Sequence, residues 1–199
     1  MKSNKFIAVS MREDKFHNGK EIRSCIDNKL LNWIFKLGYY PYLIPNDIKF
    51  KNLIKKIEFK GIILSGGNSV KRNKTRTILE YEILNYSKKK NIPVLGICHG
   101  MQVMNQFDGG KIKKVQKHVR TKHKLKNLDS NYPIEVNSYH DYSISKLGKN
   151  FRIISKSLDD EIEAIFNKKL KWLGWMWHPE RDRIFNKKLI RIAKQMFNR

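Results

Sequence analysis

The sequence predicts an α/β protein with a doubly wound, mostly parallel sheet flanked by helices. Segments with the residue pattern of strands alternate with segments whose apolar residues recur at helical spacing, and this alternation is typical of parallel sheets connected by helices. In addition, residues 92–97 (IPVLGI) form a short, continuously apolar run. Such runs are typical of parallel strands that are buried on both faces.

The elements follow one another along the chain without an evident linker or repeat. Residues 5–10 (KFIAVS) predict a first strand. Residues 21–38 predict a helix, because apolar residues recur there at helical spacing and Gly38 is suited to cap its C-terminus. The further expected elements are a strand at 39–45, a short helix at 53–59, a strand at 61–67, a helix at 77–90, the strand at 92–97 and an apolar strand at 172–177.

The charge of the chain is strongly positive. Its 199 residues include 42 Lys and Arg against 18 Asp and Glu, which gives a net charge of +24. Such an excess is compatible with a polyanionic partner such as nucleic acid or an anionic membrane. The basic residues are spread along the whole chain, however, so we expect a solvated surface and neither a nucleic-acid nor a membrane partner. A small anionic substrate remains compatible with the charge.

The two cysteines, Cys25 and Cys98, are too few for a disulfide framework. No stretch approaches the ~18 apolar residues of a membrane span, and the N-terminus has no apolar segment of the secretory type. We therefore expect a cytoplasmic protein with a single domain over residues 1–199, in which Cys98 is a free thiol. Cys25 lies on the apolar stripe of the expected helix, so we expect it in the core.

The segment GICHGMQ (96–102) places Cys98 close between two glycines, where a strand is followed by a helix. A sharp strand-to-helix turn needs small neighbours and exposes the residue at its tip, as in a nucleophile elbow. The helix N-terminus favours a thiolate through its free N–H groups and its dipole. The backbone N–H of His99 is then directed to the place where an oxyanion would form. A structural cysteine at a glycine-rich turn is the alternative interpretation.

Two other strand ends supply partners for this thiol. His178 follows the apolar segment 172–177 and is suited to take the thiol proton. Glu180 lies two residues further on, so it projects to the same side and can hold the imidazole. The segment Ser65-Gly66-Gly67 ends another strand and can offer a second oxyanion donor, the N–H of Gly67. Because active sites lie at the carboxyl ends of such strands, we expect one common site.

These motifs resemble those of the class I glutamine amidotransferases and γ-glutamyl hydrolases. GICHGMQ is similar to their cysteine elbow, HPE (178–180) to their His-Pro-Glu segment and SGG (65–67) to their oxyanion strand, in the same order. The likeness extends over nearly the whole chain. It is greatest to the γ-glutamyl-γ-aminobutyrate hydrolase branch, which implies a flavodoxin-like fold and a stand-alone hydrolase without a synthase domain.

The resemblance implies roles for individual residues. Cys98 would form a thioester with the γ-carbonyl of a glutamyl group, His178 would act as acid and base, and Glu180 would orient His178. The oxyanion would be bound by the backbone N–H groups of Gly67 and His99. No cofactor and no metal is implied. The residues that would hold the glutamyl substrate are Ser65, Gly66, Gln102, Tyr139 and His140.

The leaving group is less well defined, because the chain departs from many relatives at Asp141 and in the short, basic segment 68–77. Within that segment Lys71, Arg72, Lys74 and Arg76 either rim the leaving-group side of the pocket or form a solvated face. The short, lysine-rich chain most resembles the γ-glutamyl-CDP-amidate hydrolases of capsule phosphoramidate biosynthesis, and this resemblance implies an anionic leaving group. These enzymes release glutamate and leave cytidine diphosphoramidate.

Three other functions stay open at this point. The chain is also compatible with a γ-glutamyl-γ-aminobutyrate or γ-glutamyl-polyamine hydrolase, and with a glutaminase subunit that supplies ammonia to a separate synthase. A non-enzymatic binding module with a redox-active cysteine is the third possibility. Such a module would need Cys98 but would have no use for a base held by a carboxylate, as His178 and Glu180 are expected to be.

Overall fold

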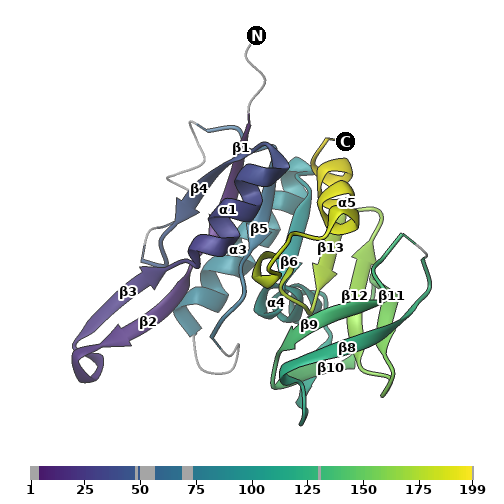
Figure 1. Ribbon diagram of the computed structural model, residues 1–199. Helices are drawn as coiled ribbons and strands as arrows, with labels where there is room; N and C mark the ends of the chain where they lie inside the picture. The colour runs from purple at the N-terminus through teal and green to yellow at the C-terminus, as the bar shows by residue number, and fades with distance from the viewer. Residues whose placement is uncertain (1–4, 48, 50–56, 69–73, 130, 199) are drawn as a thin grey trace.

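The computed structural model describes residues 5–47, 49, 57–68, 74–129 and 131–198, and its centre is a nine-stranded mixed sheet (Figure 1). One half of the sheet is parallel and the other half is antiparallel. The parallel strands are, in sheet order, β4 (Tyr40–Ile44), β1 (Phe6–Ser10), β5 (Gly61–Leu64), β6 (Val94–Ile97) and β13 (Trp172–Trp175). The antiparallel strands that continue the sheet are β12 (Ile162–Asn167), β11 (Arg152–Ser157), β8 (Val119–Asn127) and β9 (Glu135–Tyr139).

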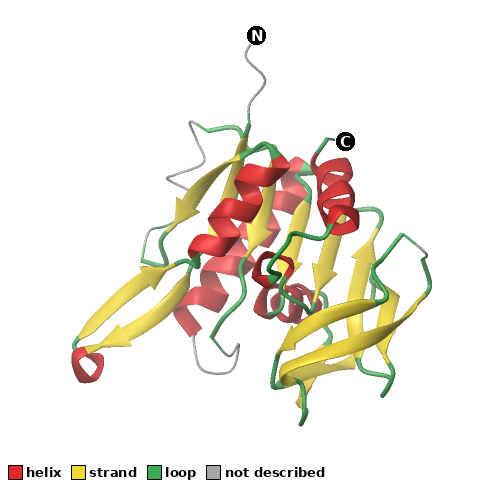
Figure 2. Cartoon of the chain, viewed as in Figure 1, coloured by secondary structure: helices red, strands yellow, loops and turns green. Residues whose placement is uncertain are grey.

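Helices cover both faces of the parallel half, as Figure 2 shows. The first face packs against α1 (Asn28–Leu37) and α5 (Lys187–Phe197), and the second against α3 (Lys74–Lys90) and α4 (His99–Phe107). Successive residues of one strand serve the two faces in turn: Ile7 of β1 joins the first core and Ala8 the second. The α/β fold class predicted from the alternating pattern is therefore confirmed, with a sheet that is mixed.

The segment 21–38 differs from the expectation, because it is not one helix. Residues Glu21–Cys25 form β3, which pairs with β2 (Arg12–Phe16) in an antiparallel hairpin that projects from the sheet (Figure 1). The turn between them contains Asn18 and Gly19 at φ of 56° and 85°, the left-handed values that an Asn-Gly pair adopts readily in hairpins. The apolar residues of this segment have a helical spacing, but the hairpin turn determines its structure.

Helix α1 begins only after this hairpin. Asp27 caps its N-terminus by accepting a hydrogen bond from the Lys29 N–H over 2.9 Å, and Gly38 ends it at φ 89°, as predicted. Cys25 is consequently not in the core, as expected, but is half-buried at the end of β3. The helix expected at 53–59 lies largely outside the described residues.

The remaining elements do not belong to the large sheet. Strands β7 (Lys111–Lys114) and β10 (Tyr142–Lys146) form a separate antiparallel pair. Two single 3-10 turns, η1 (His17–Gly19) and η3 (Pro179–Arg181), complete the described elements. In the part of the chain that the structure describes, no helix has the length and apolar character needed to cross a membrane.

Candidate active site

Cys98 stands at a strained turn between β6 and α4. Its backbone has φ 49° and ψ −102°, values that a residue with a side chain rarely adopts. The flanking glycines are there because the turn is tight: a Cβ on Gly96 would lie 2.7 Å from the backbone of Gly100, and a Cβ on Gly100 would lie 2.7 Å from Cβ of Leu64. The expected elbow geometry is therefore present, and it explains why the cysteine is placed close between glycines.

The imidazole of His178 interacts with this thiol. Burial raises the pKa of the Cys98 thiol, but the charge of His178 and a hydrogen bond with it outweigh burial and lower that pKa. In turn, burial lowers the pKa of His178, while the charges of Glu180 and Cys98 outweigh it and raise the pKa to about 9. The two groups therefore favour a thiolate–imidazolium pair.

Glu180 orients the imidazole from the other side. The Nδ1 atom of His178 donates a hydrogen bond to Oε1 of Glu180 over 2.7 Å, and both side chains are buried. Since Nδ1 is occupied in this way, the Nε2 atom is the one left for the thiol. Cys98, His178 and Glu180, which the sequence places at separate strand ends, thus lie together as expected.

Asn137 fixes the backbone of His178, and the sequence did not single it out. Its side-chain oxygen accepts a hydrogen bond from the His178 N–H over 3.0 Å, and its amide donates to the His178 carbonyl over 2.7 Å and to Asp182 over 2.8 Å. Gly66 leaves room for the ring itself, because a Cβ at this position would lie 2.5 Å from Cε1 of His178.

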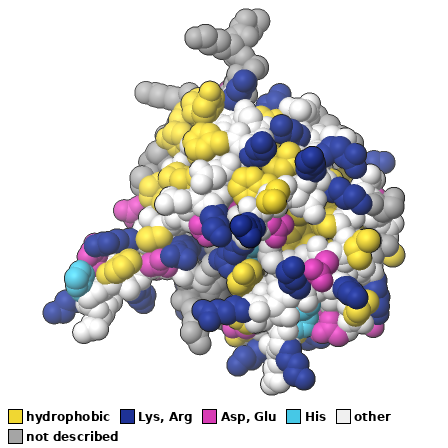
Figure 3. Space-filling model, viewed as in Figure 1, with side chains coloured by type: hydrophobic (Ala, Val, Ile, Leu, Met, Phe, Trp, Pro, Cys, Tyr) yellow, Lys and Arg dark blue, Asp and Glu magenta, His cyan; other side chains and the backbone are white. Residues whose placement is uncertain are grey.

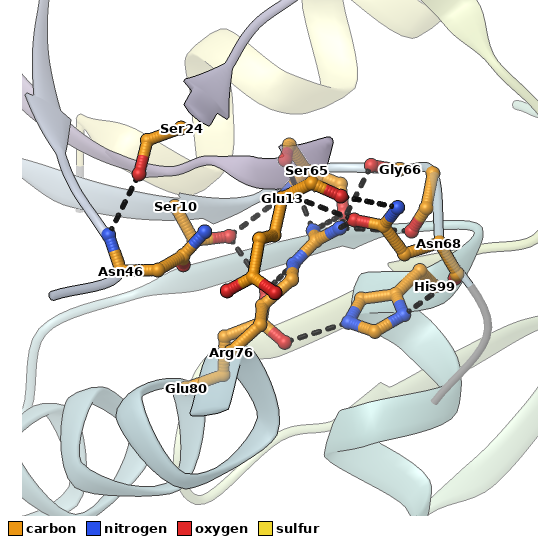
Figure 4. Close-up of polar contacts among 11 residues, drawn as sticks. Ser10, Glu13, Ser24, Asn46, Ser65, Gly66, Asn68, Arg76, Glu80 and His99 are labelled. Carbon is orange, nitrogen blue, oxygen red and sulfur yellow. Dashed lines mark hydrogen bonds and ion pairs between the residues drawn. The ribbon is translucent and has the colours of Figure 1, made fainter. Parts of the chain in front are cut away.

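The oxyanion strand is held from below by Arg76, as Figure 4 shows. The guanidinium donates to the carbonyl oxygens of Ser65 over 2.6 Å, of Gly66 over 3.3 Å and of Gly67 over 2.8 Å. In a trans peptide the C=O and the following N–H point in opposite directions. Binding of the Gly66 carbonyl therefore turns the N–H of Gly67 away from Arg76, as an oxyanion donor requires.

A buried carboxylate anchors this arrangement. Glu80 pairs with Arg76 Nε over 3.0 Å, accepts a hydrogen bond from Ser10 over 2.7 Å and lies 2.7 Å from Nε2 of His99. Burial raises the pKa of Glu80, but the charges of Arg76 and His99 and the hydrogen bonds outweigh it and lower the pKa to about 2. The His99 side chain is thus a structural tie between α3 and α4 (Figure 4), which leaves its backbone N–H for the expected role.

An open cavity of about 1140 Å³ lies next to Cys98. Three of the residues expected to hold the glutamyl group line it, namely Gln102, Tyr139 and His140. Gln102 donates its amide to the Tyr142 carbonyl over 3.0 Å, so its orientation is fixed. The ring of Tyr139 stands perpendicular to that of His178 at 5.7 Å, and the guanidinium of Arg181 lies 4.5 Å from the Tyr139 ring centre. Two of these residues, Gln102 and Tyr139, thus line the cavity beside Cys98 from fixed positions.

His140 lies at the same cavity, but its two nitrogens lie close to other groups of the protein. Its Nδ1 atom donates to the Tyr142 carbonyl over 3.1 Å, and its Nε2 atom lies 3.3 Å from Oε1 of Glu163. The expected substrate contact of His140 therefore does not come from a nitrogen directed into the cavity. The position of Glu163 behind it was not foreseen from the sequence.

The far wall of the cavity comes from the β2–β3 hairpin. Phe16 and Ile22 line it and are 37% and 60% exposed, so the wall presents apolar surface to solvent. The charged residues that line the cavity are of both signs among the described residues: Glu13, Asp14, Lys15, Lys74, Asp141 and Arg181. Lys and Arg are likewise spread over the face in Figure 3 with Asp and Glu among them, in agreement with the solvated surface expected from the sequence.

Within the basic segment after the oxyanion strand, Arg76 has a role that the sequence did not suggest. Arg76 is fully buried, so it does not rim the leaving-group side of the pocket. The reason is the ion pair with Glu80 and the three carbonyl groups that the guanidinium binds. Lys74 does line the cavity and is exposed. Lys71 and Arg72 lie outside the described residues.

Comparison with known proteins identifies the class. The family model for class I glutamine amidotransferases matches residues 21–190. A γ-glutamyl-CDP-amidate hydrolase of Campylobacter jejuni is 30% identical over an alignment of 205 positions, and the match covers 97% of this chain and 98% of that protein. The chain belongs to the class I glutamine amidotransferase family, whose members act on glutamine-like substrates.

Two further similarities concern GMP synthases. The GMP synthase of Dictyostelium discoideum is 32% identical over an alignment of 152 positions, and the match covers 70% of this chain but 20% of that protein. The crystal structure of a candidate GMP synthase component from Thermoplasma acidophilum has a TM-score of 0.75 at 19% identity and covers 98% of this chain and 94% of that one. The structural likeness supports the class I glutamine amidotransferase fold.

Proposed function

We propose that this chain is a cysteine-dependent hydrolase that releases L-glutamate from a γ-glutamyl amide. The observation that carries the proposal is the strained Cys98 elbow, whose thiol has a lowered pKa beside a His178 imidazole held by Glu180. A nucleophile, a base and an orienting carboxylate in this arrangement are suited to acyl transfer through a thioester. A redox-active cysteine alone would not need the buried His178–Glu180 pair.

The reaction has two halves. The Cys98 thiolate attacks the γ-carbonyl carbon, and the negative oxygen that forms is bound by the backbone N–H groups of Gly67 and His99. When this tetrahedral intermediate collapses, the C–N bond breaks and the imidazolium of His178 protonates the departing nitrogen. The neutral imidazole then takes a proton from water, which attacks the thioester, and glutamate leaves as the thiolate is restored.

The best candidate substrate is γ-glutamyl-CDP-amidate, with cytidine diphosphoramidate as the product. The support is the Campylobacter jejuni relative, because the match covers nearly the full length of both chains. The cavity of about 1140 Å³ is larger than a glutamyl group requires and leaves room for a nucleotide. In this assignment the glutamyl end lies near Gln102 and Tyr139, and the cytosine lies on the hairpin, where Phe16 offers an aromatic face for stacking.

The cationic groups at this cavity suit a diphosphate only in part. Lys15, Lys74 and Arg181 line it, but Glu13, Asp14 and Asp141 do so as well. The lysines at the hairpin and at the start of α3 are exposed, so each contact with a phosphate is worth at most about 1 kcal/mol. If the substrate is a nucleotide, these lysines should therefore lower its KM only moderately. The contacts to the glutamyl group should contribute more to specificity.

Substrate comparison tests the proposal. Glutamate release is measured with γ-glutamyl-CDP-amidate, γ-glutamyl-γ-aminobutyrate, γ-glutamyl-putrescine and glutamine, and ³¹P NMR follows the nucleotide product. We expect the highest kcat/KM for γ-glutamyl-CDP-amidate, with Cys98→Ala as the inactive control. Preference for the aminobutyrate or putrescine compound would contradict the nucleotide assignment but keep the hydrolase. Absence of glutamate release from all four would refute the hydrolase.

A second candidate is a glutaminase subunit that supplies ammonia to a separate synthase and has no role in capsule biosynthesis. It is supported by the likeness to GMP synthases, of which this chain matches only a part. This function predicts that glutamine is the best substrate and that its hydrolysis is stimulated by a partner. Release of ammonia from glutamine, measured with and without lysate fractions, distinguishes it from a stand-alone hydrolase.

A further inference from the structure

Three histidines and a glutamate meet behind the active-site cavity. His118 precedes β8, His123 lies within β8, His140 lies between β9 and β10, and Glu163 belongs to β12. The side chains of His118, His140 and Glu163 are at least 97% buried, and that of His123 is 11% exposed. None of the four was expected from the sequence to bind a metal.

A β-bulge brings the two histidines of one segment together. His118 and His123 are five residues apart, so a regular strand would point them to opposite faces. The pairing of β8 with β9 shifts between Val119 and Thr121, where the intervening Arg120 has φ 55°. The extra residue restores the phase, so that both rings lie on one face together with that of His140. Their ring centres are 4.3 to 5.9 Å apart.

The nitrogens of all three rings are directed at one carboxylate oxygen. Oε1 of Glu163 lies 3.3 Å from His140 Nε2, 3.8 Å from His123 Nε2 and 4.0 Å from His118 Nδ1. One ligand atom from each residue can be chosen so that all four lie within 4.8 Å of one another. Zn²⁺ with bonds of about 2.0–2.1 Å holds tetrahedral ligands about 3.3 Å apart. The cluster is therefore only slightly wider than a loaded site.

These atoms have no other partner among the described residues. His118 Nδ1, His123 Nε2, His140 Nε2 and both oxygens of Glu163 are buried without a hydrogen bond. Buried polar groups are costly when they are unsatisfied, and five of them in one place are unusual in a native structure. An ion pair between a protonated His140 and Glu163 would satisfy only one ring and would leave the other two nitrogens without a partner.

Two of the rings already have the outer contacts that metal-binding histidines make. The Nε2 atom of His118 donates to Asp159 over 2.9 Å, and the Nδ1 atom of His140 donates to the carbonyl oxygen of Tyr142 over 3.1 Å. Each contact fixes the tautomer, because the proton stays on the outer nitrogen and the lone pair of the inner one faces the cluster. Ligating histidines characteristically donate their second nitrogen to a carboxylate or a carbonyl in this way.

We propose that His118, His123, His140 and Glu163 bind one Zn²⁺ ion in a closed, four-coordinate site. Three imidazoles and one carboxylate suit Zn²⁺, whereas Mg²⁺ and Ca²⁺ prefer oxygen ligands. Since four protein ligands fill a tetrahedral shell, the site is structural and keeps no position for substrate. The ion joins three segments of the antiparallel part of the fold and fixes the turn that follows Tyr139, the last residue of β9 and the neighbour of His140.

Metal analysis of the protein tests this site. The chain is produced without a histidine tag, in medium with zinc, and its metal content is determined by inductively coupled plasma mass spectrometry. We expect about one zinc ion per chain. Removal of the ion with a chelator lowers Tm, and added Zn²⁺ restores it by about 5 °C or more. Replacement by Co²⁺ gives the intense visible absorption bands of tetrahedral cobalt, which octahedral cobalt with mostly water ligands would not give.

Variants show where the ion binds. His123→Ala and Glu163→Gln should each lose the zinc, whereas the control His17→Ala, which removes an exposed histidine outside the cluster, should keep it. The thiol of Cys98 is the other candidate ligand, so Cys98→Ser must also retain about one zinc ion. Loss of zinc in Cys98→Ser would overturn the proposal. A wild-type chain that holds no zinc, and whose Tm does not respond to added Zn²⁺, would overturn it as well.

Discussion

Arg76 donates a hydrogen bond to the carbonyl oxygen of Gly67 over 2.8 Å, from a fully buried guanidinium. The same group binds the carbonyl oxygens of Ser65 and Gly66, so one side chain determines the orientation of three successive peptides. A lysine has a single ammonium group and does not reproduce this fork. Arg76 is held by the buried Glu80 carboxylate and in turn fixes the peptide that carries the proposed oxyanion donor, the N–H of Gly67, without contacting the substrate.

Arg76→Lys should therefore reduce kcat by about 10- to 100-fold and change KM little, because it disturbs the N–H of Gly67 and not the glutamyl contacts. Steady-state kinetics well below Tm measure the effect. Arg191→Lys, at an exposed position on α5, is the matched control and should behave as wild type. If Arg76→Lys raises KM and leaves kcat unchanged, Arg76 does not position the oxyanion strand.

Glu80 should make the fold sensitive to acid. Its pKa is lowered from 4.5 to about 2, so the folded state releases this proton more readily than the unfolded state. The resulting stability is fully present above the unfolded pKa of 4.5 and is lost as the pH falls toward the folded value of about 2. A shift of this size corresponds to about 3 kcal/mol of unfolding free energy at neutral pH.

Denaturant unfolding at a series of pH values checks this expectation. Glu80→Gln should be less stable than wild type near pH 7, because Arg76 loses its buried partner. Between about pH 5 and about pH 3, however, the unfolding free energy of the variant should fall less steeply than that of wild type. Parallel slopes for the two proteins would show that the Glu80 carboxylate does not have the lowered pKa.

The two cysteines should differ in reactivity. The pKa of Cys98 is lowered by His178, whereas burial and the neighbouring Asp14 raise the pKa of Cys25. Iodoacetamide near pH 7 should therefore alkylate Cys98 first and abolish glutamate release. Cys98→Ala should be inactive and folded, and Cys25→Ala should keep near-normal turnover. Mass spectrometry of the alkylated peptides identifies the site, and preferential labelling of Cys25 would contradict the assignment.

The elbow and its partners could be predicted from the sequence because each is encoded locally. Gly96 and Gly100 mark a turn at which a Cβ would collide with neighbouring backbone and side chains, and His178 and Glu180 are only two residues apart. The fold class could be predicted for the same reason, because each apolar strand and each helix is recognised from its own residues. These parts of the fold and of the candidate site need no knowledge of contacts between distant segments.

The parts that were missed depend on such contacts. Arginine is usually a surface residue, so the sequence gives no reason to expect Arg76 in the interior. Its guanidinium is buried because it forms an ion pair with Glu80, four residues later, which is buried as well. Asn137 acts across 41 residues on the backbone of His178. In the zinc cluster the signal was three of the six histidines between residues 118 and 140, but their common face results from the bulge at Arg120. The hairpin carried a local signal, the Asn-Gly pair at 18–19, which the helical spacing of the following apolar residues obscured.

The leaving group can be examined through the lysines at the cavity. Lys15→Ala combined with Lys74→Ala should raise KM about fivefold for γ-glutamyl-CDP-amidate and leave a neutral γ-glutamyl anilide unaffected, since each exposed ion pair contributes well under 1 kcal/mol. Added salt should reduce the difference between the variant and wild type by screening.

The matched control for this variant lies on the same helix. Lys88→Ala combined with Lys89→Ala removes two charges from the last turn of α3, at the opposite end from Lys74 and away from the cavity. This control should not change KM for either substrate. An equal response of both substrates to the Lys15 and Lys74 changes would show that these lysines do not meet a nucleotide.

Gly66 provides the sharpest test of the His178 geometry. A Cβ at this position would lie 2.5 Å from Cε1 of the imidazole, and the φ of Gly66 is not in the left-handed region, so Gly66→Ala acts by displacing the ring. We expect the pKa of Cys98, measured from the pH dependence of alkylation, to rise toward its ordinary value, because the displaced imidazolium no longer stabilises the thiolate.

His178→Asn should raise that pKa as well and reduce kcat by ~10²–10⁴ or more. If Gly66→Ala acts through His178, the double variant should show the same thiol pKa as His178→Asn alone, since the second change has nothing left to displace. Additive shifts of the thiol pKa would mean that Gly66→Ala affects Cys98 by a route other than displacement of the His178 ring, and an unchanged thiol pKa in His178→Asn would contradict the thiolate–imidazolium pair.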